Sequence, residues 1–361
     1  MRRRGTHQVS LEPLASITRE RIGTFPPVVC SRGASARCEN DAGGLFQHPA
    51  NEHGVALLLA LLVLALLVAL ILEFDTEARR EYHDAAAFRD NFKATVLTRA
   101  AVQAARAVLQ QDFLKDRQTG QFYDAPTDLW AFPIQQYAIG DGLLTAQIED
   151  ERSKLNLNDL AGGGDLNARK TKVLRAKRLF ELLQVSPDLV DAIVDWVDQD
   201  EVPEPAGAES LYYQNLKPPY RAANAPLQTL RELRLIKGMT ADNFEKIARL
   251  VTVYPQEGEG RVNINTAESA VLQSLDPRIS QAVAGEIIQG RPYRTIQELD
   301  RVGSFEAVGK ELRLQNAYDI KSDIFSARMT LTINDVVKQA LVTLRRDPNT
   351  GSSTVLYYRI L

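Results

Sequence analysis

The chain has 361 residues, which is enough for more than one compact domain, and 45% of them are hydrophobic. With 43 basic and 46 acidic residues its formal net charge is −3, so it lacks the overall basic character of a nucleic-acid-binding protein. Both cysteines, Cys30 and Cys38, precede residue 54, and His83 is the only histidine after it. A Ser-His-Asp hydrolase or a histidine-ligated zinc site is therefore disfavoured, and we expect no enzymatic activity.

An apolar run directly follows Gly54. Residues 55–72 are all Ala, Val, Leu or Ile, and a run of this length can cross a bilayer as a helix. The run ends at Glu73-Phe74-Asp75 without the small-residue cleavage site of a secretory signal, so the plausible processing point lies before it, between Gly54 and Val55. This order is typical of a type IV prepilin, although composition alone favours an ordinary single-span membrane protein.

Helical patterning continues beyond the apolar run. No Gly or Pro occurs between Val55 and Thr119, and apolar residues recur at three- to four-residue spacing from Phe74 to Val96. We predict one helix from Val55 to about Asp112, roughly 85 Å long, whose amphipathic second half packs on a sheet. A membrane span followed by a separate helix is the alternative.

Strand-like segments lie on both sides of a helical block. Residues 137–150 contain a turn at Gly140-Asp141-Gly142, and three further strand-like runs cover residues 327–334, 336–346 and 353–360. Between them, helical spacing occurs in seven segments: 170–184, 187–198, 227–236, 241–251, 267–275, 279–289 and 296–302. The pattern predicts an α+β fold in which a large all-α domain is inserted into a sheet domain.

A six-residue motif occurs twice. Residues 154–159 and 261–266 both read basic-aliphatic-Asn-aliphatic-Asn-Asp/Thr. The alternation predicts a short strand, and the polar side chains at 158–159 and 265–266 are expected to cap the helices that follow. A structural role therefore explains the motif.

Acidic residues are densest at the end of segment 187–198 and in the loop after it. They are Asp195, Asp198, Asp200, Glu201, Glu204 and Glu209. Such a supply of oxygen ligands suits Ca²⁺, although the spacing is not that of an EF-hand. A solvated acidic loop is the alternative, and glycoside hydrolysis is disfavoured because few aromatic residues accompany the carboxylates.

Residues 263–299 resemble a helix-hairpin-helix DNA-binding unit. In such a unit a Gly-x-Gly hairpin offers backbone N–H groups to phosphate. The corresponding loop here, residues 275–280, has no glycine and contains Asp276 and Pro277. We expect the segment to serve packing, and a membrane-anchored DNA-binding protein remains the alternative function.

Several of these motifs occur together, in this order, in one family. Over residues 54–361 the chain resembles the minor pseudopilin K of type II secretion systems (GspK). The motifs that carry the resemblance are Gly54 with its apolar run, Asp195-Trp-Val-Asp-Gln-Asp200, Gly207-Ala-Glu209, Tyr212-Tyr213, Pro218-Pro-Tyr220, Asn224 and Val262-Asn-Ile-Asn-Thr-Ala267.

The resemblance implies a type IV pilin-like fold, in which a long N-terminal helix packs on an antiparallel sheet with a large inserted all-α domain. It implies that a prepilin peptidase cuts after Gly54 and that the amine of Val55 is methylated. It further implies an inner-membrane anchor, a periplasmic C-terminal domain and a place at the pseudopilus tip with three other minor pseudopilins, above the major pseudopilin. There the protein would initiate and cap assembly for the export of folded proteins across the outer membrane.

On this basis the chain divides into a prepilin leader (1–54), a transmembrane and spine helix (55–112), two parts of the pilin β domain (113–164 and 321–361) and an inserted α-domain (165–320). A leader of 54 residues is unusually long and has no basic residue close to Gly54. We therefore expect the true translation start to lie downstream of Met1, at a non-ATG codon.

By the same resemblance the family's calcium sites map to Asp198, Asp200 and Glu209, with Glu201 and Glu204 as further candidates.

A second feature concerns the fifth mature position, where most pilins carry a Glu that neutralises the N-terminal ammonium of the subunit ahead. Here that position is Leu59. Because an unpaired charge in lipid is costly, a subunit without this carboxylate is tolerable where no pilin lies ahead, which favours the tip.

Overall fold

The protein is described by a computed structural model that covers residues 52–161 and 166–360. The expected leader (1–54) and the question of the translation start therefore lie almost wholly outside the described residues. The chain forms two compact units, one up to Ile71 and one from Leu72 onward. The predicted fold elements all belong to the second unit, apart from the apolar run.

The first unit contains the apolar part of helix α1 (Glu52–Thr119). Gly54, Val55 and Leu59 are all exposed there, and no residue of the apolar stretch is buried within the protein. Among the described residues this is the one helix that is long and apolar enough to cross a membrane. An apolar surface of this size is stable in lipid or against other helices, but not in water.

Helix α1 continues to Thr119, seven residues beyond the end predicted at Asp112, and it is one helix as expected. The next residue is Gly120, whose φ of 68° is left-handed, a conformation that suits glycine and ends the helix. The extension was missed because Asp112 and Asp116 are polar, which interrupts the apolar pattern, yet both are buried in the structure. The expected boundary between the helix and the pilin β domain therefore falls inside α1.

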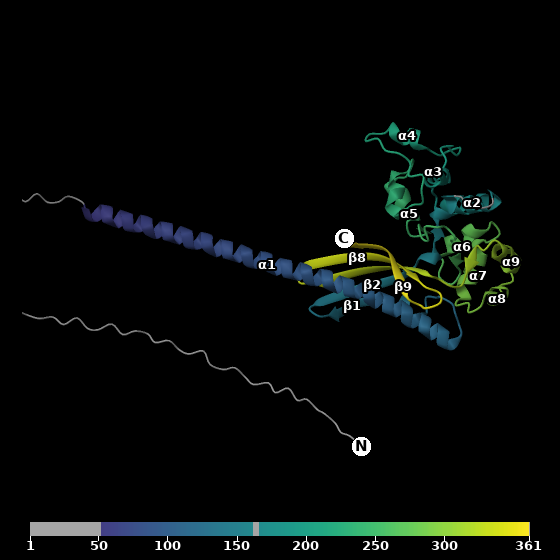
Figure 1. Ribbon diagram of the computed structural model, residues 1–361, viewed down its shortest axis with the longest axis horizontal. Helices are drawn as coiled ribbons and strands as arrows, with labels where there is room; N and C mark the ends of the chain where they lie inside the picture. Colours follow the sequence, from purple (N-terminus) through teal and green to yellow (C-terminus); the bar gives the residue numbers. More distant parts are fainter. Residues whose placement is uncertain (1–51, 162–165, 361) are drawn as a thin grey trace, which may run out of the picture. The chain divides into compact units, whose positions relative to one another are not determined.

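Five antiparallel strands form the sheet in the order β1-β2-β7-β8-β9 (Figure 1). Their bounds are β1 Ile134–Ile139, β2 Gly142–Asp150, β7 Ile324–Ile333, β8 Val336–Arg346 and β9 Ser353–Ile360. The bounds of β8 and β9 agree with the predicted runs, and the turn at Gly140-Asp141-Gly142 joins β1 to β2. At the centre of the sheet, β2 pairs with β7 from Leu143 opposite Thr332 to Asp150 opposite Phe325.

One face of α1 packs on this sheet. Ala94, Ala101 and Ala105 are buried there, and their small side chains let the helix approach the strands closely. Leu109 is fully buried among strand residues, and Trp130 of the 3-10 helix η1 (Leu129–Ala131) closes the same core. The helix-on-sheet core of the predicted pilin-like fold is therefore present.

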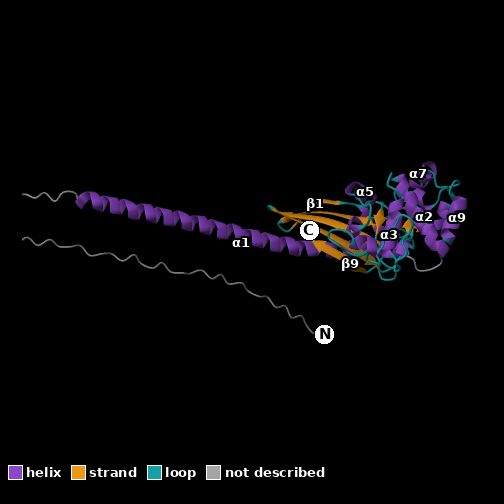
Figure 2. Cartoon of the chain, turned by 90° about the horizontal axis from the view of Figure 1, so that it is seen from above, coloured by secondary structure: helices purple, strands orange, loops and turns teal. Residues whose placement is uncertain are grey.

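The insertion between β2 and β7 is mainly helical (Figure 2). Its α-helices are α2 Leu166–Leu182, α3 Asp188–Val197, α4 Ser210–Gln214, α5 Ala241–Ile247, α6 Ser269–Leu275, α7 Gln281–Gln289, α8 Ile296–Leu299 and α9 Glu306–Leu314. The predicted segment 227–236 is instead the 3-10 helix η4 (Leu230–Leu235), and α4 and α9 were not predicted. In α9, Gly309 and four charged residues obscure the helical pattern.

Each copy of the repeated motif forms a short strand. In each copy a buried asparagine, Asn158 or Asn265, also binds the backbone of a distant residue, and we call these contacts the two asparagine clamps. The strands are β3 (Leu155–Asn156), which pairs with β4 (Val251–Thr252), and β5 (Val262–Asn263), which pairs with β6 (Tyr318–Asp319). Along the chain, β3 lies between the 3-10 helices η2 (Glu151–Ser153) and η3 (Leu157–Ala161).

The prediction that Asn158 and Asn265 cap the following helices was wrong. Asn158 Oδ1 accepts from the N–H of Leu227 at 2.7 Å while Asn158 Nδ2 donates to the carbonyl of Leu227 at 3.0 Å. Asn265 binds the N–H and carbonyl of Tyr293 in the same way, at 2.8 and 2.9 Å. Both side chains are buried, where an amide must satisfy both its donor and its acceptor, and this requirement decides their role.

The helix-on-sheet core gives a stability prediction. Leu109→Ala should lower the free energy of unfolding by about 2–5 kcal/mol, because it leaves a cavity under a fully buried side chain. The matched control is Leu114→Ala on the same helix, where the leucine is 44% exposed and the expected loss is about 0.5 kcal/mol or less. Denaturant unfolding of the full chain in detergent, followed by tryptophan fluorescence, measures both; equal losses would contradict the packing.

Candidate metal centre

The candidate site lies at the C-terminal end of α3. Every residue of α3 from Leu189 to Val197 is buried, so the position of the helix end is fixed by core packing. Trp196 packs edge-on against Tyr213 of α4, with ring centroids 5.2 Å apart, and Tyr213 stacks on Tyr220 at 5.2 Å. This aromatic packing holds α4, which follows the acidic loop, close to the end of α3.

The acidic loop is folded back on α3 by Asp195. The N–H of Glu204 donates to Asp195 Oδ1 at 2.9 Å, and a Cβ added at Gly207 would lie 1.9 Å from Asp195 Oδ2, so the loop requires glycine there. Lys237 Nζ donates to the carbonyls of Ala206 and Gly207, at 3.3 and 2.8 Å. The loop therefore returns to its starting point, and its two ends lie side by side.

Three of the five predicted metal ligands meet at this point. Asp198, Asp200 and Glu209 each offer a carboxylate oxygen, and these oxygens all lie within 4.8 Å of one another. Asp198 and Glu209 are buried, while Asp200 is exposed and leaves the group open to solvent. Glu201 and Glu204 do not belong to this group of neighbouring oxygens.

Several oxygens around the group have no hydrogen-bond partner although they are buried. They are Oδ1 of Asp198, both carboxylate oxygens of Glu209 and Oδ1 of Asn224. The other oxygen of Asp198 accepts from Arg169 at 2.6 Å. Buried acceptors without donors are costly, and a hard cation that prefers oxygen ligands is the kind of group that would satisfy them.

Electrostatics support the same interpretation. Burial, together with the charges of Asp195 and Asp198, raises the pKa of the Glu209 carboxyl to about 7. Burial also raises the pKa of Asp195 to about 6. The three carboxylates of the group face one guanidinium, that of Arg169, so their ionised forms carry an excess of negative charge that a divalent cation would balance.

Glu201 has a different role from that expected of a ligand. It accepts hydrogen bonds from the N–H and the hydroxyl of Ser210, at 3.3 and 2.9 Å, and so closes the loop onto α4. It also accepts from Asn224 Nδ2 at 3.2 Å, and the same nitrogen donates to the carbonyl of Asp200 at 3.1 Å. Asn224 was one of the motifs that carry the family resemblance, but it was not among the predicted ligands, because an asparagine 15 residues beyond Glu209 has no local link to the acidic cluster.

In the segment that resembles a helix-hairpin-helix unit, the hairpin loop does not favour phosphate. In the loop between α6 and α7, Arg278 is paired with Asp276 at 2.8 Å and with Glu311. Its guanidinium is therefore already neutralised by two carboxylates. The alternative of a DNA-binding protein has no support from the structure of this loop.

Comparisons with known proteins agree on one family. Family models of type II secretion system protein K match residues 153–256 and 262–321. Type II secretion system protein K of Klebsiella pneumoniae is 31% identical over 66% of this chain and 75% of its own length. Protein K of Aeromonas hydrophila is 28% identical over 79% of this chain and 90% of its own length.

A solved structure has the same fold. The crystal structure of the GspK-GspI-GspJ complex from the enterotoxigenic Escherichia coli type 2 secretion system matches with a TM-score of 0.64 and 20% identity, over 79% of this chain and 99% of the matched chain. Together with the family models and the Klebsiella relative, these findings leave one assignment. The chain belongs to the type II secretion system protein K family, which makes it a minor pseudopilin.

Proposed function

We propose that this minor pseudopilin occupies the tip of the type II secretion pseudopilus, where it initiates and caps assembly for the export of folded proteins. In this role it acts through assembly with other subunits, and it needs no catalytic group of its own. The proposal rests chiefly on one structural observation, the two-faced surface of α1 in the second unit.

Helix α1 carries an exposed aromatic stripe beyond the apolar run. Phe88 is 75% exposed, and Phe92 and Val96 are exposed as well. At about 100° per residue these positions share one side of the helix, whereas Ala94 and Ala101, which pack on the sheet, lie on the other. An exposed apolar stripe on a helix that is already packed on one side is a docking face for further helices.

The partners we propose are the other minor pseudopilins of the same system, with the major pseudopilin below them. In enterotoxigenic Escherichia coli, GspK is found in a complex with GspI and GspJ. Helices of equivalent subunits would pack against the stripe of α1 in this chain. Anchoring in the inner membrane by residues 55–72, with the second unit in the periplasm, would align these helices before assembly.

The N-terminal residues fit a processed tip subunit. Cleavage by the prepilin peptidase between Gly54 and Val55 would place a methylated Val55 amine at the start of α1, and both residues are exposed. Leu59 replaces the glutamate that other pilins offer to the amine of the subunit ahead. A subunit of this kind has no compensating carboxylate for a neighbour in front of it, which suits the tip and not the shaft.

The docking face gives a prediction on assembly. Phe88→Asp and Phe92→Asp should each reduce co-purification with the other minor pseudopilins from detergent extracts by about tenfold or more. A loss of about 1.4 kcal/mol of binding free energy is enough for a tenfold loss of affinity. Thermal unfolding should change little, because both residues are exposed. Phe132→Asp is the matched control, an aromatic that is 62% exposed outside α1. Unchanged co-purification of both α1 variants would contradict the docking face.

The tip position and the processing can be tested on the same filaments. In isolated pseudopili, a gold label on this subunit should lie at filament ends, and N-terminal sequencing of the subunit should begin with methylated Val55. A label distributed along the shaft would contradict the tip position. A subunit that retains residues before Val55 in active filaments would contradict cleavage, whatever its position.

We further propose that Asp198, Asp200 and Glu209 hold a calcium ion, with Asn224 as an additional oxygen donor. The support is the set of buried oxygens without partners at this point. The ion would supply positive charge to a loop that otherwise carries repelling carboxylates. Asp198 and Asp200 lie at one end of the loop between α3 and α4, and Glu209 lies at the other. An ion bound by all three would hold the two ends of the loop together and so make the inserted domain more rigid.

Calcium should therefore stabilise the full chain. At a free concentration 100 times Kd, a single site adds about 2.7 kcal/mol to the free energy of unfolding. Asp200→Asn and Glu209→Gln should lose this contribution, while Glu204→Gln, which alters an acid outside the group, should retain it. In chelator the variants should be no less stable than the wild type, because they remove repulsion. Retention of the full calcium effect in Glu209→Gln would contradict the site.

A further inference from the structure

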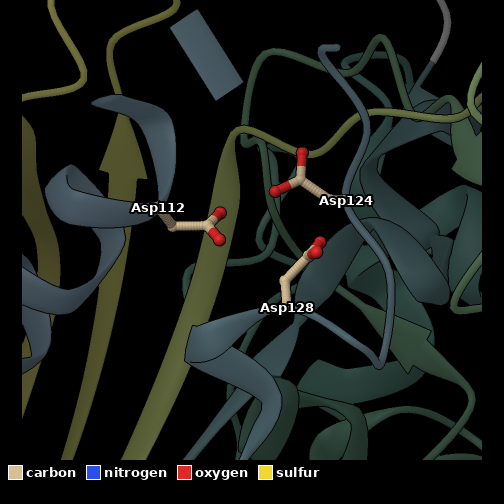
Figure 3. A group of neighbouring side chains, drawn as sticks. All are labelled: Asp112, Asp124 and Asp128. Atoms are coloured by element: carbon tan, nitrogen blue, oxygen red, sulfur yellow. The ribbon is translucent and has the colours of Figure 1, made fainter. Parts of the chain in front are cut away.

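A second group of buried acids lies outside the inserted domain. Asp112 near the end of α1, together with Asp124 and Asp128 of the loop before η1, each place a carboxylate oxygen within 4.8 Å of the others. All three side chains are buried, and Figure 3 shows their carboxyl groups turned toward one another. The group joins residues from the helix and from the connection that leads to β1.

One oxygen in this group has no partner. Asp112 is 1% exposed, and its Oδ1 makes no hydrogen bond although it is buried. This atom belongs to a side chain that points toward Asp124 and Asp128 (Figure 3). A buried carboxylate oxygen without a donor indicates a missing positive group, since leaving it bare costs free energy.

Among the described residues, one cation is in direct contact with the group. Arg346 of β8 donates to Asp112 Oδ2 at 3.2 Å and to both oxygens of Asp124, at 2.6 and 2.7 Å. It therefore faces Asp124 and one edge of Asp112, and no contact joins it to Asp128. Asp128 accepts only from the N–H of Ala125, at 2.7 Å. The charge of Lys115 also acts on Asp128, but the two form no ion pair. Three ionised carboxylates therefore have one guanidinium in direct contact, and negative charge is in excess.

We propose that Asp112, Asp124 and Asp128 bind a divalent cation, for which Ca²⁺ is the best fit. The donors are oxygens only, and each carboxylate retains free lone pairs, since a carboxylate has about four acceptor positions. Ca²⁺ tolerates irregular geometry and completes its shell with water or carbonyl oxygens, whereas Mg²⁺ demands a near-ideal octahedron. A cavity of about 370 Å³ borders Asp124 and Arg346 on one side of the group.

The consequence of binding is structural. The ion ties the C-terminal end of α1 to the connection before β1, and Arg346 ties the same group to β8. This brace acts within the pilin domain and is independent of the proposed calcium site at Asp198, Asp200 and Glu209. Loss of one site therefore leaves the other intact, which makes the two proposals separable.

Counting bound calcium tests the proposal. Calorimetric titration of the full chain in detergent with Ca²⁺ should show one ion fewer per chain in Asp112→Asn and in Asp128→Asn. Asp116→Asn is the matched control, because Asp116 is a buried acid of the same helix end that lies outside the group of three. It should bind as many ions as the wild type. Equal counts in the wild type, Asp112→Asn and Asp128→Asn would overturn the proposal.

Hydrogen exchange gives a second measurement that needs no change in the group. In Asp200→Asn, which lacks the other proposed site, Ca²⁺ at about ten times Kd should slow exchange of residues 121–128 about tenfold, because opening requires release of the ion. This result would support the brace even if Asp112→Asn and Asp128→Asn failed to fold. Exchange in residues 121–128 that is the same in calcium and in chelator would mean that protons, not a metal ion, neutralise the group.

Discussion

A single buried carboxylate, that of Asp150, connects the sheet to the insertion at both of its ends. Asp150 is the last residue of β2, and its Oδ2 accepts from Asn263 Nδ2 at 2.9 Å, from Thr266 Oγ1 at 2.5 Å and from Ser322 Oγ at 2.6 Å. Its Oδ1 accepts from the N–H of Arg152 at 2.7 Å. The bonds therefore join the exit of the chain from the sheet, the second repeated motif and the return of the chain before β7. Burial raises the pKa of Asp150 to about 6 even though the hydrogen bonds from its hydroxyl and amide partners act in the opposite direction.

This constraint explains how a sheet can remain in register although its central strands are separated in sequence by the whole insertion. The pairing of β2 with β7 closes a very long loop, which is entropically costly if the loop is free. The Asp150 bonds and the two asparagine clamps divide the insertion into segments with fixed ends. The helices can then pack into their own core, and the acidic loop after α3 is held in a fixed geometry.

The proposed membrane, docking and metal sites have one property in common. Each contains apolar area or carboxylate oxygens for which the described part of the isolated chain provides no cover or partner. Residues 55–72 and the aromatic stripe of α1 present apolar area that requires lipid or neighbouring helices. The two carboxylate groups bury oxygens that require a positive charge. The proposed membrane anchor, partner helices and calcium ions would each satisfy one of these groups.

The sequence by itself determined the main elements and the family. Periodicity located α1, the five strands and most helices of the insertion, because their patterns arise from local spacing of apolar residues. The acidic residues cluster locally in the sequence, and the family resemblance pointed to Asp198, Asp200 and Glu209 among them. Only the tertiary structure decided which carboxylates meet. It separated Glu201 from the group, placed Asn224 against Glu201 and the carbonyl of Asp200, and joined Asp112 to Asp124 and Asp128 across the end of α1. The physical reason is that contacts between residues distant in sequence depend on how whole elements pack, and no local pattern records that packing.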